Sequence, residues 1–140
     1  MPRSVPSIRS NGSSPIAERR AAREVRTFGD LARWVRDREI PLELSPSSNL
    51  QTGAIAKWGT ALEDHPFDLL YQLGFAVTVN VDNRTMSRTS LTRELALLAE
   101  TFDYRLEDLE AFQLNAAAGA FLSVEEREEL IELIGEGFSA

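Results

Sequence analysis

The sequence of this 140-residue chain predicts an α/β fold with parallel strands. Two short apolar segments with alternating polarity, at 40–44 and 75–81, have the pattern of strands. About thirty residues with a helical segment separate them, and a crossover of that kind joins parallel neighbours. Parallel sheets are normally built from several strands and covered on both faces, so two strands alone predict an incomplete sheet with two unpaired edges.

Composition limits the class of protein. Hydrophobic residues make up 43% of the chain, enough for one ordinary domain with a core. Cysteine is absent, which excludes disulfides, thiolate zinc sites and a cysteine nucleophile, and the expected location is the cytoplasm. No apolar run approaches the roughly 20 residues that cross a bilayer, so no membrane is expected as a partner.

Charge divides the sequence into two parts. Residues 1–26 carry six Arg and two Glu among many Ser and Pro residues, which predicts a disordered basic tail. Their composition also resembles a transit peptide, which is the alternative. Residues 27–140 form the predicted domain and carry twenty acidic against nine basic residues. Such an acidic body repels phosphate backbones, so nucleic acid is not expected as a partner.

The N-terminal half of the domain begins with a predicted helix. Leu31, Trp34 and Val35 lie at helical spacing, which predicts a helix from Asp30 to about Arg38. The strand at 40–44 follows and ends at the turn-rich residues 45–49, after which 49–53 is expected to be a loop.

The second half begins with a short helix and alternates with one strand. Pro66 suits the first helical position and Gly74 a helix stop, so a helix is predicted over 66–73. After the strand at 75–81, Thr89 or Ser90 caps a helix that runs to about Thr101, with Leu91, Leu95 and Leu98 facing inward. Two more helices are predicted, over 105–115 and 124–134.

Candidate functional residues follow the second strand. Asp82, Asn83 and Arg84 come directly after it, and the C-terminal ends of parallel strands are where such folds present groups to ligands. Asp82 could ligate a metal, act as a base, or form a turn with the backbone. The Asn83 amide could bond to the edge of a heterocycle or serve turn chemistry.

Other polar residues give weaker indications. His65 is the single histidine, and a capping or surface role before Pro66 is favoured over a ligand role. One histidine without cysteine cannot complete a zinc site. Ser45, Ser47 and Ser48 lack a paired base and a G-x-S-x-G elbow, so turn or ligand-contact roles are favoured over nucleophilic ones.

Four segments form one ordered pattern: PLELSPSSNLQTG at 41–53, HPF at 65–67, VTVNVDNRTMSRTSLT at 77–92 and NAA at 115–117. Together they resemble the C-terminal part of bacterial adenosine deaminases. The resemblance covers about residues 28–122 in one register.

The resemblance implies a (β/α)8 TIM barrel with zinc at the C-terminal ends of the strands. Such enzymes are expected to convert adenosine and water to inosine and ammonia. By this resemblance Asp82 is the metal-binding aspartate of the last strand. Asn83 stands where many relatives have a second aspartate that touches the purine, and so becomes the expected substrate-binding residue.

The same resemblance implies that this chain is a partial barrel, its last two βα units plus C-terminal helices. The histidine ligands and the catalytic glutamate of the family have no counterpart, and residues 1–26 show no resemblance. We therefore expect a deaminase fragment that neither holds zinc nor acts alone. The alternatives are a non-catalytic binding module or one half of a split deaminase, and open strand edges predict self-association or a complementing chain.

Overall fold

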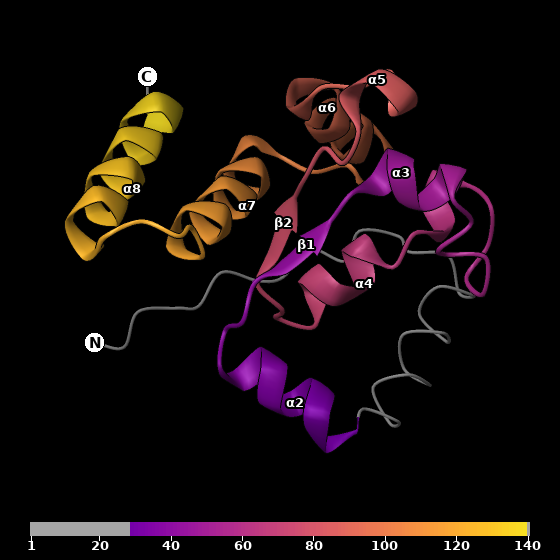
Figure 1. The fold of residues 1–140 in the computed structure, drawn as a ribbon, viewed down its shortest axis with the longest axis horizontal. Coiled ribbons are helices and arrows are strands. Elements are labelled where there is room, and N and C mark those ends of the chain that lie inside the picture. Colours follow the sequence, from indigo (N-terminus) through magenta and orange to yellow (C-terminus); the bar gives the residue numbers. More distant parts are fainter. Residues whose placement is uncertain (1–28, 140) are drawn as a thin grey trace, which may run out of the picture. The chain divides into compact units, whose positions relative to one another are not determined.

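A computed structural model describes residues 29–139 and shows a helix-rich α/β fold with one small sheet (Figure 1). The predicted tail at 1–26 lies outside the described residues. In order along the chain, the helices and strands are α2 (Asp30–Asp37), β1 (Leu42–Leu44), α3 (Pro46–Gln51), the 3-10 turn η1 (Leu62–Asp64), α4 (Phe67–Gln72), β2 (Val77–Val79), α5 (Arg84–Ser87), α6 (Leu91–Phe102), α7 (Leu106–Ala118) and α8 (Val124–Ser139).

The two strands pair in parallel, which confirms the predicted crossover. Leu42 lies opposite Val77 and Leu44 opposite Val79. The pairing begins where Leu42 donates its amide to Ala76 and ends where Asn80 donates to Leu44, each over 2.8 Å. Both strands are shorter than the segments predicted from alternation, with 42–44 in place of 40–44 and 77–79 in place of 75–81.

The core lies where α4 and α7 meet β2. Phe67, Val77, Leu98 and Phe112 are completely buried. The rings of Phe67 and Phe112 pack edge to face with centroids 5.1 Å apart, and Tyr71 packs against Phe112 in the same way at 4.9 Å. Edge-to-face pairs at these separations are favourable beyond the area that they bury, so this aromatic cluster holds α4 and α7 together beside the strand.

The sequence prediction was wrong for most of residues 45–53. Residues 46–51 form α3 and not a turn followed by a loop, and the helix continues through the expected loop start at Asn49. Pro46 occupies the first helical position, where its missing N–H costs nothing. Serine and asparagine are weak helix formers on their own, so the helix depends on contacts with distant segments, described below.

A second helix, α5, was not expected after Asp82. It is four residues long and ends at Arg88, whose φ of 48° lies in the left-handed region. The other predicted helices are confirmed, with α7 and α8 longer at their C-terminal ends. Leu91 does not face inward as expected, since it is 39% exposed at the first turn of α6. Within 29–139 no helix is long and apolar enough to cross a membrane.

Candidate functional site

Side chains that follow the C-terminal ends of the two strands meet at the carboxylate of Asp82. Asp82 follows β2, and Ser48 lies in α3, which follows β1. Ser48 donates its hydroxyl to Asp82 Oδ2 over 2.8 Å. Ser48 is only 9% exposed, whereas Asp82 is exposed. The parallel sheet thus brings together two residues that are 34 positions apart in the sequence.

Asn83 caps helix α5 with its side chain. Its Oδ1 accepts hydrogen bonds from the backbone amides of Thr85 and Met86, at 3.2 and 3.0 Å. The turn-chemistry alternative is therefore what the structure shows for the oxygen. The Nδ2 group makes no hydrogen bond with residues of the described range, and Asn83 is exposed, so a donor of two protons remains for a ligand.

His65 is a buried capping residue. Its Nδ1 accepts from the Phe67 amide at 3.0 Å, so Nε2 carries the proton and donates to Asn49 Oδ1 at 3.0 Å. Burial lowers the pKa of His65, and the nearby Glu94 carboxylate opposes this shift. The predicted capping role is confirmed, but the ring is 3% exposed and not on the surface. Both nitrogens are occupied, so His65 offers no lone pair to a metal.

Glu94 is a residue that the sequence analysis missed. Its side chain is 1% exposed. Oε2 accepts from the Ser47 amide at 3.0 Å and Oε1 from the Thr89 hydroxyl at 2.5 Å. A signal was present in the sequence, because Glu94 lies four residues before Leu98 and so shares the predicted buried face of that helix. A carboxylate on such a face requires hydrogen-bond partners.

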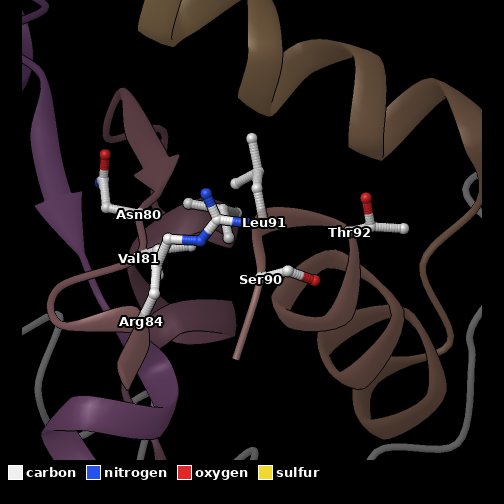
Figure 2. Close-up of a pocket in the computed structure, with 7 residues that line it drawn as sticks. Asn80, Val81, Arg84, Ser90, Leu91 and Thr92 are labelled. Atoms are coloured by element: carbon white, nitrogen blue, oxygen red, sulfur yellow. The ribbon is translucent and has the colours of Figure 1, made fainter. Parts of the chain in front are cut away.

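A shallow cavity of about 410 Å³ lies beside the end of β2 (Figure 2). Arg84 at the start of α5 and Leu91 at the start of α6 both line it. The remaining lining residues are Val79, Asn80, Val81, Ser90 and Thr92. Asp82 is not among them, so this cavity and the Ser48–Asp82 contact are separate features.

The donor groups of the described residues do not by themselves fit a zinc ion. Zinc in proteins takes three or four nitrogen, sulfur or carboxylate ligands. No group of three or more His, Cys, Asp or Glu side chains in residues 29–139 is placed to hold a metal. Asp82 could contribute one oxygen, and His65 is already engaged.

This arrangement defines an α/β protein that presents polar side chains at the C-terminal ends of parallel strands. The model of the adenosine deaminase family matches residues 19–137, so the chain belongs to that family. The match is longer than the resemblance expected at 28–122. It includes residues 19–26, where no resemblance was expected, and that expectation was wrong.

Individual relatives agree with the family. The chain is 51% identical over 105 residues to an adenosine deaminase of Mycobacterium ulcerans, and 48% identical over 113 residues to adenosine deaminase 1 of Streptomyces coelicolor. These alignments cover 75% and 80% of the chain, and in both cases 28% of the relative. The chain thus spans somewhat more than a quarter of the relatives that it matches.

A solved structure shows a similar fold. The crystal structure of adenine deaminase from Arthrobacter aurescens superposes with a TM-score of 0.73 at 20% sequence identity. The superposition covers 83% of this chain and 34% of that protein. At this identity the likeness concerns the arrangement of helices and strands.

Proposed function

We propose that this chain provides the last two βα units of a (β/α)8 barrel in a zinc-dependent adenosine deaminase. Such an enzyme converts adenosine and water to inosine and ammonia. The observation that carries the proposal is the placement of Asp82, which follows a parallel strand and accepts a hydrogen bond from Ser48 at the end of the neighbouring strand. In barrel enzymes, catalytic groups come from the C-terminal ends of several strands.

Asp82 is proposed as one ligand of the metal. Ser48 occupies Oδ2, and Oδ1 accepts no hydrogen bond from residues 29–139, so one oxygen is free to bind. Because the described residues do not fit zinc alone, the other ligands must come from outside them. The 140-residue chain is therefore expected to be inactive by itself.

Asn83 is proposed as a substrate contact. Its oxygen is engaged at the start of α5, so the amide nitrogen is the group available to a purine. That nitrogen donates only, which suits an acceptor nitrogen on the edge of the ring. A carboxylate at this position would have to be protonated to do the same.

The experiment has two arms. The purified chain with adenosine and added zinc is expected to form no inosine, and zinc-dependent inosine formation would contradict the proposed inactivity. In the second arm, the matched segment of this chain replaces the corresponding 105 residues of the Mycobacterium ulcerans enzyme. This chimera is expected to be active and to lose both zinc and activity on Asp82→Ala.

A matched control is Glu100→Ala, because Glu100 is an exposed carboxylate on α6 away from the site. It should leave zinc content and activity unchanged. Full zinc content in the Asp82→Ala chimera would refute the role of Asp82 as a ligand.

The expected partners of the isolated chain are tested by measuring its molecular mass in solution. Exposed strand edges predict self-association of the isolated chain or binding to a complementing chain. Light scattering after size-exclusion chromatography measures the first, and co-expression with the preceding part of the relative measures the second. A monomer that restores no activity would contradict both expectations.

A further inference from the structure

We infer that Glu94 is a positioning residue that holds helix α3 in the place from which Ser48 reaches Asp82. The inference deepens the proposed function and rests on it for the importance of Asp82. Its evidence is independent, since it comes from the hydrogen bonds of α3.

The N-terminus of helix α3 has no side-chain cap from the residue that precedes it. Ser45 occupies the N-cap position but makes no side-chain capping hydrogen bond. Pro46 has no N–H, so Ser47 carries the first amide of the helix that needs an acceptor. Glu94 Oε2 accepts it at 3.0 Å. A carboxylate from α6, 47 residues further along the chain, thus performs the capping that the helix's own sequence does not.

Glu94 is itself held firmly. Its other oxygen accepts from Thr89, directly before the N-cap of α6, and the side chain is 1% exposed. A buried carboxylate with both oxygens bonded has little freedom to change rotamer, because any other position would leave buried oxygens without hydrogen-bond donors. Glu94 therefore gives α3 a fixed attachment point.

Three consecutive residues of α3 each bind a different distant partner. Ser47 bonds to Glu94, Ser48 to Asp82 and Asn49 to His65. Ser48 and Asn49 use their side chains, which point about 100° apart on the helix, whereas Ser47 uses its backbone amide, which points along the helix axis. The three bonds therefore hold the helix from three directions. Weakening the bond at Ser47 should therefore shift its immediate neighbour Ser48. That shift should change the hydrogen bond that Ser48 donates to the exposed side chain of Asp82.

The test uses nuclear magnetic resonance on the full 140-residue chain and needs no enzyme activity. The readout is the carboxyl carbon signal of Asp82, with the Ser47 amide proton as a second probe. Ser48→Ala shows the signal of Asp82 without its donor. Glu94→Gln is expected to move the Asp82 signal in the same direction as Ser48→Ala does. In the double variant, adding Glu94→Gln to Ser48→Ala is expected to cause little further shift. Glu100→Gln removes the same charge from an exposed position on α6 and should leave the signal in place.

Thr89→Val is the milder variant to use if Glu94→Gln prevents folding. It removes one of the two bonds that hold Glu94. A folded Glu94→Gln or Thr89→Val chain in which the Ser47 amide moves but the Asp82 signal does not would overturn the inference and leave Glu94 a purely structural role. The chimera with Asp82→Ala tests the proposed function separately, so either conclusion can fail alone.

Discussion

Asn115 on α7 donates its side-chain amide to the backbone oxygen of Val77 in β2 over 3.0 Å. In a parallel pair, alternate residues bond to the same neighbour. Because β1 uses the oxygen of Ala76 and the amide of Asn80, the oxygen of Val77 points to the opposite edge of β2. No strand pairs with that edge among residues 29–139. A side chain thus satisfies a backbone group that a neighbouring strand would otherwise bind.

The first prediction concerns this bond. Asn115→Ala should lower the free energy of unfolding by about 1–3 kcal/mol, because the completely buried Val77 keeps an unsatisfied carbonyl. Gln113→Ala is the control, since Gln113 lies in the same helix and its side-chain amide makes no hydrogen bond with the described residues. Urea unfolding followed by circular dichroism measures both, and equal losses would show that the bond has no special value.

The second prediction concerns the two tyrosines. Burial, then the hydrogen bond to Asp108, raises the pKa of Tyr71 to about 12, and burial with the Asp68 carboxylate raises the pKa of Tyr104. At a pH just above 10 both hydroxyls stay protonated in the folded chain, whereas a tyrosine of the unfolded chain loses its proton. The unfolded state is therefore favoured increasingly, and stability should fall as pH rises above about 10.

Ultraviolet absorbance measures the tyrosinate directly, because Tyr71 and Tyr104 are the two tyrosines of the chain. Little tyrosinate should form near pH 10 in the folded protein, and much more in urea. Asp108→Asn should lower the pKa of Tyr71 by removing the carboxylate that its hydroxyl binds. Ordinary titration of both groups in the folded chain would contradict the prediction.

Local sequence patterns predicted the helices and strands that depend on neighbouring residues. Helical spacing predicted α2 and α6, and alternation predicted the two strands. Ser90, one of the two expected caps of α6, accepts a hydrogen bond from the Arg93 amide. The position of Asp82 and Asn83 after a parallel strand also followed from the sequence, although the strand ends at Val79, three residues before Asp82.

Long-range hydrogen bonds explain what the sequence did not predict. The serines of 45–49 favour a turn locally, and their helix depends on Glu94, 47 residues away. The bond from Ser48 to Asp82 likewise joins segments that become neighbours when the strands pair. For α5, the capping bonds of Asn83 fit a turn as well as a helix, so the sequence left both open.

The third prediction concerns Arg88, which ends α5 with a φ of 48°. A left-handed conformation strains residues with a Cβ atom, and glycine relieves that strain while losing more entropy on folding. Arg88→Gly should therefore raise the free energy of unfolding by about 0.5–1 kcal/mol. Arg93→Gly, inside α6, should lower it by about 1 kcal/mol. Thermal unfolding compares the two, and a destabilised Arg88→Gly chain would refute the strain.

The fourth prediction concerns His65. Burial lowers its pKa from the usual 6.5. At a pH just below 6.5 the folded chain should therefore keep the ring neutral, whereas the unfolded chain binds a proton there. His65 therefore contributes stability that is complete above pH 6.5 and declines as pH falls through the lowered pKa. Nitrogen chemical shifts of this single imidazole should show the Nε2–H form at neutral pH, since Nδ1 accepts from Phe67. His65→Asn keeps an acceptor for that amide and should remove this part of the pH dependence. A ring that titrates at or above 6.5 in the folded chain would show that the Phe67 bond and burial do not control its protonation.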